Sequence, residues 1–313
     1  MVVGQSTLGQ AVGGAVAGAA ALDRTARAHR PMTVLRDNLR TLLLGTPLAV
    51  ACTAVVVFWV VVAVIGPLVV PGEPIVTDVG ARLSAPSAAH WLGTDEFGRD
   101  VAARLVSGAR VSLTLASITV VVCLVVGTLL GAVAGFNERL SQVLMRVVDA
   151  VMAIPGLVLA IVLMAVLGQG LGTIVIALSV VHIPLFARVA FGEVRALKEL
   201  EFAQAASALG ASRWRILTRH FLPSMTSSLT VQASYVLSTA IITEASLSFL
   251  GAGVPPPTPS WGAEISSGKT YLFTAPWMLW PAVIALTTLV LAVSLLGDRL
   301  RDVLDFRADG GSL

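Results

Sequence analysis

Few residues of this chain have types and spacings that could perform chemistry. The strongest candidate is the segment 262–270, which looks like the phosphate-binding pattern G-x-x-x-x-G-K-T. That pattern requires a glycine where Ala263 stands, and Gly262 comes one residue too early. A phosphate-binding loop also joins a strand to a helix, and no strand-like segment precedes this one. The sequence therefore predicts no nucleotide site here.

The remaining ionisable and thiol groups do not form a catalytic or metal-binding set. Asp95 and Asp100 could suggest a cation site, but an arginine follows each of them four residues later, and such spacing favours ion pairs on a helix. Cys52 and Cys123 lie far apart inside apolar runs, a spacing typical of neither a disulfide framework nor a metal site. No Ser/His/Asp or Cys/His arrangement is present either. We therefore expect no catalytic residue, no metal and no cofactor in this chain.

The composition indicates that most of the chain lies in a membrane. Of its 313 residues, 56% are hydrophobic and 12% are charged, with a mean hydropathy of +0.87, whereas a soluble domain carries about twice that charged share. The net charge of +3 is small, so nucleic acid is not an expected partner. A spanning helix needs about 20 mostly apolar residues. Six segments meet this requirement: 47–70, 111–136, 147–168, 171–188, 225–245 and 277–297.

The distribution of basic residues predicts the orientation of these spans. With six spans, 16 of the 21 Lys and Arg residues fall on one side and 5 on the other. Because basic residues accumulate on the cytoplasmic side, we expect both termini and the loop 189–224 to be cytoplasmic. His182 is the one titratable group in the middle of a span, and we interpret it as a hydrogen-bonded packing residue. Ion-coupled carriers place charged groups there, so energy for any transport is expected to come from another chain.

The segment 225–245 is the least hydrophobic of the six spans, because it contains many Ser and Thr residues. Their hydroxyl groups either form hydrogen bonds with neighbouring helices or line a water-filled path through the membrane. The two interpretations are compatible, and the sequence leaves both open.

The loop 189–224 has the pattern of a folded element. A short helix is predicted from four residues at helical spacing: Phe202, Ala205, Ala206 and Leu209. Gly210 suits a C-terminal cap, Ser212 can cap a second, basic amphipathic helix, and Pro223 can open the next span. The face of small residues suits either a groove on a partner or a lipid surface.

The two loops on the other side of the membrane also carry patterns. In the loop 72–110, the spacings Asp95–Arg99 and Asp100–Arg104 predict an amphipathic helix that rests on the bundle. In the loop 247–270, a proline cluster predicts a stiff extended segment, and Trp261 is expected to anchor it at the membrane interface.

Four motifs, in order along residues 40–305, resemble those of the dipeptide/oligopeptide permease family of binding-protein-dependent ABC importers, specifically its C-type subunit. The outer stretch HWLGTDEFGRD (90–100) matches with Trp91 in place of proline, and VVDAVMAIPGLVLAIVL (147–163) and LSFLGAGVPPPTPSWG (247–262) also match. The cytoplasmic loop resembles the EAA motif of these importers. Its matching positions are Gln204, Ala205, Ala206, Gly210, His220, Leu222 and Pro223. Gln204 replaces the usual acidic residue.

The resemblance implies an all-α polytopic membrane protein of the type I ABC importer permease fold. Six transmembrane helices are expected, together with an outer amphipathic helix and a cytoplasmic coupling helix. The expected parts are a cytoplasmic tail (1–40), the first transmembrane helix (41–72), an extracytoplasmic loop with the amphipathic helix (73–110), a core with five transmembrane helices (111–305) and a C-terminal tail (306–313).

The resemblance also implies partners and sites. The expected partners are a homologous B-type permease, two cytoplasmic ATPases that bind ATP and Mg, an extracytoplasmic substrate-binding protein, a peptide substrate and the lipid bilayer of the bacterial inner membrane. The residues implied in ATPase coupling are Phe202, Gln204, Ala205, Ala206, Leu209, Gly210 and Ala211. The implied extracytoplasmic motif is Gly93, Thr94, Asp95, Gly98, Arg99 and Asp100. The residues expected near the binding protein are Pro257, Pro259, Trp261 and Gly262.

The resemblance identifies the substrate less sharply than the fold. Importers of nickel, glutathione and oligosaccharides use similar permeases, so these remain alternatives to peptides. A membrane scaffold or receptor without transport activity is the alternative from another class, although such a protein would not need the small-residue cytoplasmic helix.

Overall fold

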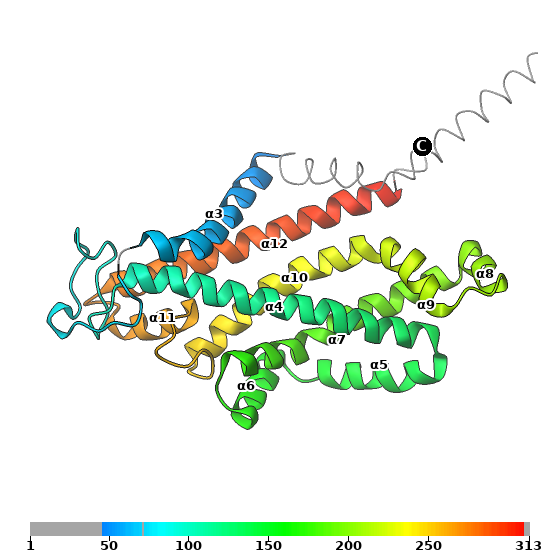
Figure 1. The fold of residues 1–313 in the computed structure, drawn as a ribbon, viewed down its shortest axis with the longest axis horizontal. Coiled ribbons are helices and arrows are strands. Elements are labelled where there is room, and N and C mark those ends of the chain that lie inside the picture. The colour runs from blue at the N-terminus through cyan, green and yellow to red at the C-terminus, as the bar shows by residue number, and fades with distance from the viewer. Residues whose placement is uncertain (1–45, 71, 310–313) are drawn as a thin grey trace, which may run out of the picture.

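The computed structural model describes residues 46–70 and 72–309, which form an elongated bundle of helices (Figure 1). The α-helices are α3 (Pro47–Val69), α4 (Val101–Phe136), α5 (Glu138–Met152), α6 (Gly156–Leu167), α7 (Leu171–Lys198), α8 (Glu201–Ala208), α9 (Arg213–Ile216), α10 (Leu222–Phe249), α11 (Trp261–Gly268) and α12 (Trp280–Asp309). The short turns are η1 (Val79–Ala81), the π-helical η2 (Leu217–Phe221), η3 (Lys269–Tyr271) and η4 (Pro276–Met278). The all-α prediction is confirmed, while the tail expected over 1–40 lies outside the described residues.

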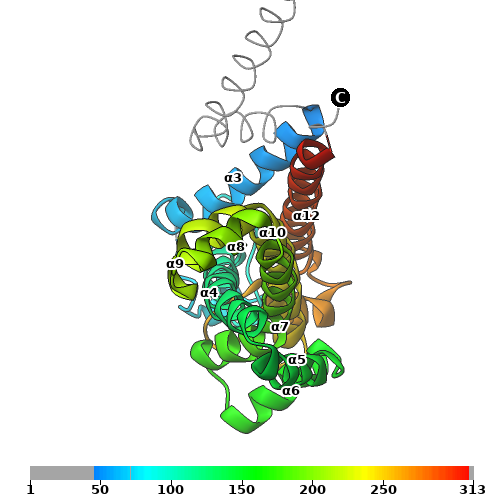
Figure 2. The same ribbon diagram turned by 90° about the vertical axis from the view of Figure 1, so that its right-hand side faces the viewer.

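The helices are arranged around a central group formed by α4, α7 and α10. Viewed along the bundle, α3 and α12 lie on one side of this group, and α5 and α6 lie on the opposite side (Figure 2). α8 and α9 form one end of the bundle, and α11 with the segment 72–100 forms the other (Figure 1). We refer to these as the α8 end and the α11 end.

Four helices among the described residues are long and apolar enough to cross a membrane: α3, α4, α7 and the segment Pro276–Val303 that includes α12. The bent pair of α5 and α6 makes a fifth candidate if the two helices form one span. α10 is 28 residues long but is not apolar enough to join them, because of the hydroxyl groups noted in its sequence. The structure thus supports four or five spans by length and composition.

The span predicted over 147–168 is broken rather than straight. α5 begins at Glu138 and ends at Met152, α6 begins at Gly156, and the two helices are bent by 93°. Pro155 stands at this break and has no N–H for a helical hydrogen bond, and it also disfavours helical geometry in the residue before it. The break therefore has a local cause in the sequence, at Pro155.

The central contact between α4 and α7 depends on glycines of α4. A Cβ atom at Gly131 would lie 2.2 Å from the carbonyl oxygen of Ala187, and one at Gly135 would lie 2.5 Å from Cγ1 of Val194. Small residues at such positions allow the backbones of two membrane helices to approach closely. This contact fixes α4 against the helix that leads to α8.

The prediction of a separate amphipathic helix in the loop 72–110 is wrong. Residues 94–100 form a compact turn, and the helix starts only at Val101 and then continues without a break as α4. Gly98 has φ +75°, and a Cβ atom there would lie 1.7 Å from the carbonyl oxygen of Asp78. The turn is thus set by a left-handed glycine and by contact with a distant part of the loop.

Candidate functional site

At the α8 end, the predicted short helix and its turn are present. Gly210 has φ +80°, and the N–H of Ala211 donates to the carbonyl of Ala206 at 3.1 Å. This is the hydrogen bond of a glycine-terminated helix. Ser212 then caps α9 by accepting from the N–H of Arg215 at 3.3 Å. The cap signals in the sequence therefore gave the correct local geometry.

α8 has apolar residues on its exposed side as well as on the side that packs against the rest of the chain. Ala203 is buried against the bundle, whereas Phe202 is 43% exposed and Leu209 is 89% exposed. Ala205 is exposed as well and Ala206 is half-buried. The outer face of α8 and of Leu209, the residue after it, is thus apolar and uncovered by the described part of the chain.

Gln204, which stands where the resemblance expects an acidic residue, contacts its own chain. Its side-chain Nε2 donates to the carbonyl oxygen of Glu199 at 3.0 Å. The amide thus ties α8 to the end of α7, an interaction that a carboxylate could not make because it has no N–H donor.

The inner side of α8 is joined to the core of the bundle. Ala203 belongs to a buried cluster with Ile216 and Phe221, which also contains Phe186 and Val194 of α7. The rings of Phe136 and Phe221 stack at 5.5 Å with an interplanar angle of 3°. These contacts join α8 to the ends of α4, α7 and α10.

At the α11 end, the predicted motif is a buried charged cluster. Arg99 Nε donates to Asp95 Oδ2 at 2.6 Å, and Asp95 Oδ1 accepts from the backbone N–H groups of Phe97 and Arg99. Thr94 is fully buried, and its hydroxyl donates to the carbonyl of Ala81. These contacts hold the loop in a compact conformation. Burial of the carboxyl group of the neighbouring Glu96 raises the pKa of Glu96 above its usual value.

The predicted pair between Asp100 and Arg104 does not form. Asp100 instead caps α4 by accepting from the N–H of Ala103 at 2.8 Å, and its other oxygen lies 2.9 Å from Nδ1 of His90. Arg104 points to α11, where its Nη2 donates to Oε1 of Glu264 at 2.6 Å and its Nε donates to Oε2 at 3.1 Å. The ion pair links residues far apart in sequence, so spacing rules could not predict it.

The residues expected near a binding protein are mostly buried in this chain, and their proximity to such a partner stays a prediction. Pro257 is exposed, but Pro259, Trp261 and Gly262 are buried. Trp261 is not an interfacial anchor: its ring packs edge-on against Trp59 at 5.1 Å, and its Nε1 donates to the carbonyl of Leu105 at 3.0 Å. An indole with a hydrogen-bond partner in the core stabilises the bundle rather than its surface.

The segment that looks like a phosphate-binding loop is helical over most of its length. Residues 261–268 form α11, and the Lys269 ammonium lies 4.2 Å from the centre of the Phe249 ring. Among the described residues, no group of three or more His, Cys, Asp or Glu side chains could hold a metal ion.

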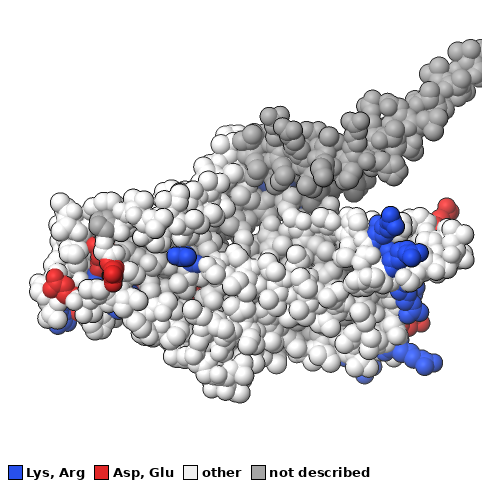
Figure 3. Space-filling view, in the orientation of Figure 1, with Lys and Arg blue, Asp and Glu red and all other residues white. Residues whose placement is uncertain are grey.

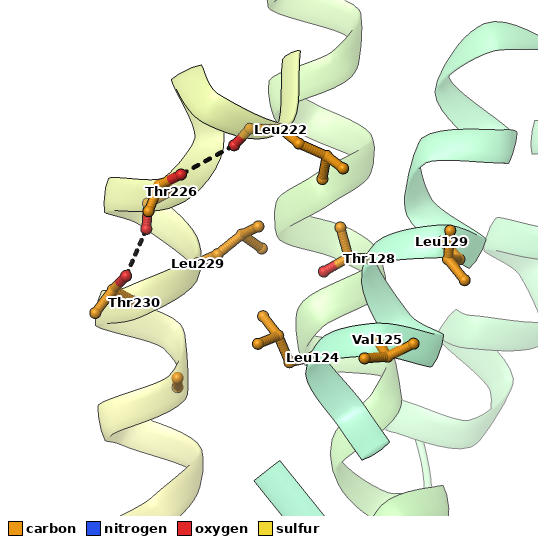
Figure 4. A pocket seen from close by; sticks show the side chains of 9 residues that line it. Leu124, Val125, Thr128, Leu129, Leu222, Thr226, Leu229 and Thr230 are labelled. Carbon is orange, nitrogen blue, oxygen red and sulfur yellow. Dashed lines mark hydrogen bonds between the residues drawn. The ribbon is translucent and has the colours of Figure 1, made fainter. Parts of the chain in front are cut away.

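Between the two ends, most hydroxyl groups of α10 bond to backbone carbonyls one turn earlier, whereas Ser228 donates to the carboxylate of Glu193 on α7. Thr226 and Thr230 donate to the carbonyls of Leu222 and Thr226, as Figure 4 shows. Beside them lies a cavity of about 570 Å³ between α4 and α10, lined mainly by leucine and threonine side chains. The hydroxyl of Thr128 faces this cavity, is buried, and has no hydrogen-bond partner among the described residues.

Glu244 is a residue whose importance the sequence did not reveal. Its carboxyl group is fully buried near the end of α10 and accepts hydrogen bonds from Ser112 of α4 and from Ser248, each at 2.8 Å. It thereby joins α4 to α10 near the α11 end. The signal that could have found it is an acidic residue inside a hydroxyl-rich span.

Charged side chains lie at the two ends of the molecule. In Figure 3, basic groups gather over α8, α9 and α5, acidic and basic groups mix at the α11 end, and the surface between them is almost entirely uncharged. His182 lies inside this uncharged region, and its Nδ1 is 2.7 Å from the carbonyl of Leu178, as expected for a packing residue. The charge pattern is that of a protein with two water-facing ends and an apolar belt.

Comparisons with known proteins identify the arrangement. The model of the binding-protein-dependent transport system inner membrane component family matches residues 127–310. A probable D,D-dipeptide transport system permease protein of Escherichia coli K12 is 35% identical, with 92% of this chain and 98% of that protein covered. A putative peptide transport system permease protein of Brucella suis biovar 1 is 43% identical over 79% of this chain and 84% of its own length. A glutathione transport system permease protein of Pectobacterium atrosepticum is 42% identical over 70% and 73%.

A solved structure shows a similar fold. The MetNI methionine ABC transporter in an inward-facing conformation has a chain that superposes with a TM-score of 0.53 at 23% identity, covering 64% of this chain and 96% of that one. The fold is thus that of a type I ABC importer permease. With a family model that matches more than half of its length and a relative that matches nearly all of it, this chain belongs to the family of binding-protein-dependent transport system inner membrane components.

Proposed function

We propose that this chain is the permease subunit of an ATP-driven importer for di- and oligopeptides. It forms half of the pathway through which peptides pass after delivery by an extracytoplasmic binding protein. The observation that carries this proposal is the near full-length match to permeases named for peptide and dipeptide transport. The chain is a multi-pass component of a bacterial inner membrane, and a homologous B-type permease completes the pathway.

The proposed membrane arrangement has six spans. They are α3, α4, the bent pair of α5 and α6, α7, α10 and α12. α10 is long enough at about 42 Å for 28 residues, and its bonded hydroxyl groups lower the cost of placing it in the bundle. We propose that the basic α8 end is cytoplasmic, that both termini of the chain are on the cytoplasmic side of the membrane, and that the α11 end faces outward.

We propose that α8 is the coupling helix, seated in a groove of one of the two ATPase subunits that bind ATP and Mg. The argument rests on its exposed apolar residues, Phe202 and Leu209, at the basic end of the molecule. ATP-driven movement can do work on this chain only through a rigid contact, because no charge lies centrally in the spans for an ion gradient to drive. Because Ala203 is buried in the core of the bundle, α8 is held firmly against the other helices and its contact with an ATPase would be rigid.

Peptides are the substrate that the chain supports best. A nickel importer would favour side chains that chelate metal, and no such group is found among the described residues. Glutathione is itself a short peptide and shares its terminal carboxylates and amides with the proposed substrates. Oligosaccharides are the remaining alternative within the same machine.

A deletion strain tests the proposal. Loss of this chain should abolish uptake of labelled short peptides, and restoring the gene should recover it. Uptake of glutathione, nickel and an oligosaccharide is measured in the same strains. Normal peptide uptake with loss of one of the other solutes would refute the peptide assignment and leave the importer architecture intact.

A further inference from the structure

An arginine of α4 is exposed where the apolar belt meets the α11 end. Arg110 is nine residues into α4, and it lines a cavity of about 370 Å³ with Val60 and Val64 of α3. At 1.5 Å per residue, these valines are about 8–14 Å from the end of α3 at Val69. Gly108, two residues before Arg110, packs against Ser260 and Trp261 at the start of α11, so Arg110 lies at the border between the α11 end and the apolar belt.

This arginine has no partner of its own. Within residues 46–70 and 72–309, Arg110 forms no ion pair and no side-chain hydrogen bond. Arg99 and Arg104 near the same end both bind carboxylates. An unpaired cation in lipid is costly, so such residues face protein or a water-filled path. The face of α4 that carries Arg110 is thus turned away from lipid.

Two hydroxyl groups next to Arg110 are also without partners. Thr114 and Ser117 are exposed, follow Arg110 by one and two helical turns, and line the same cavity. Neither forms a hydrogen bond with another described residue. The contrast with Thr119 on the same helix is informative, because its hydroxyl donates to the carbonyl of Leu115 at 2.8 Å. One cavity therefore gathers three side chains with free donors.

We propose that Arg110, Thr114 and Ser117 form a site in the translocation pathway for the terminal carboxylate of a peptide. A guanidinium group matches a carboxylate with two parallel hydrogen bonds, and the hydroxyl groups supply further donors. The cavity falls within the size range of small-molecule sites.

This inference rests on the proposed function and needs its own test. The assembled importer is placed in liposomes with its binding protein saturated by alanyl-alanine or by alanyl-alanine amide, which lacks the carboxylate. Uptake is measured for the wild type and for Arg110→Gln, Arg110→Lys and Arg139→Gln. Arg139 is an exposed arginine of α5 outside the belt and serves as the matched control.

We expect Arg110→Gln to lower uptake of alanyl-alanine about tenfold, the usual effect of losing a hydrogen bond to a charged group, and to leave uptake of the amide unchanged. Arg110→Lys should retain most of the activity, and Arg139→Gln all of it. An equal loss for both peptides, with less of the second permease co-purified, would show that Arg110 contacts that subunit and would overturn the site. Unchanged uptake of both peptides would overturn it too. Failure of the wild-type complex to transport either peptide would instead refute the proposed function.

Discussion

Replacing Gly131 with alanine tests the contact between α4 and α7 most directly. The added Cβ atom would lie 2.2 Å from the backbone oxygen of Ala187 and 2.8 Å from the Cβ atom of Ala190. Ordinary contacts of this kind are above 3 Å, so the two helices must move apart by about 1 Å. The obstacle is backbone and not the end of a flexible side chain, so no rotamer change relieves it. Overpacking of this kind costs about 1–3 kcal/mol.

The assay is thermal unfolding of the purified chain in detergent, and Gly192→Ala is the control. Gly192 lies inside α7, the helix that packs against α4, but a Cβ atom there meets nothing within 4 Å. Alanine at that position should be neutral or stabilising by up to about 1 kcal/mol, because alanine has a higher helix propensity than glycine. We expect a midpoint several degrees lower for Gly131→Ala and no decrease for Gly192→Ala. Equal midpoints for the two variants would refute close packing of α4 on α7.

Three further predictions concern α8, the orientation and the outer loop. Ala206→Arg or Gly210→Val should reduce transport and substrate-stimulated ATP hydrolysis about tenfold or more while the chain still co-purifies with its B-type partner, whereas intact transport in both variants would contradict a coupling role. With Cys52 and Cys123 changed to alanine, a cysteine that replaces Thr270 should react with an impermeant thiol reagent in intact cells, and a cysteine that replaces Ala208 should not. Labelling of the cysteine at position 208 would show that the orientation is the opposite of the one proposed. Glu96→Gln should raise the thermal midpoint at pH 7–8, because burial raises the pKa of Glu96 and ionisation then costs stability. That advantage should shrink as the pH falls toward the usual glutamate pKa of about 4.5, and an advantage that grows at low pH would contradict this account.

The parts of the structure that the sequence predicted are those set by neighbouring residues. The turn at Gly210 and the cap at Ser212 depend on a few adjacent positions, and both are present. The break at Pro155 has a local cause as well, but hydropathy averaged across it and suggested one straight span. Local rules thus identified elements well and their continuity less well.

The parts that the sequence did not predict depend on contacts between distant segments. Arg104 stands four residues after Asp100, yet it pairs with Glu264, which is 160 residues away. Trp261 is of a residue type that often anchors a chain at the membrane interface, but here it is buried, because its indole N–H donates to the carbonyl of Leu105 and its ring packs against Trp59. In each case a geometrically better partner from another helix replaced the one suggested by spacing.

These distant contacts explain how a push on α8 could reach the opposite end of the molecule. α8 is fixed to the core through Ala203 and the cluster that it shares with α7, and α7 is held against α4 by the glycines at close approach. α4 has 36 residues and is about 54 Å long, so it runs the whole length of the bundle. At the opposite end of α4, Arg104 forms an ion pair with Glu264 of α11. If α8 is the coupling helix, as proposed above, a tilt of α4 driven from α8 would move α11 and the Arg110 face together.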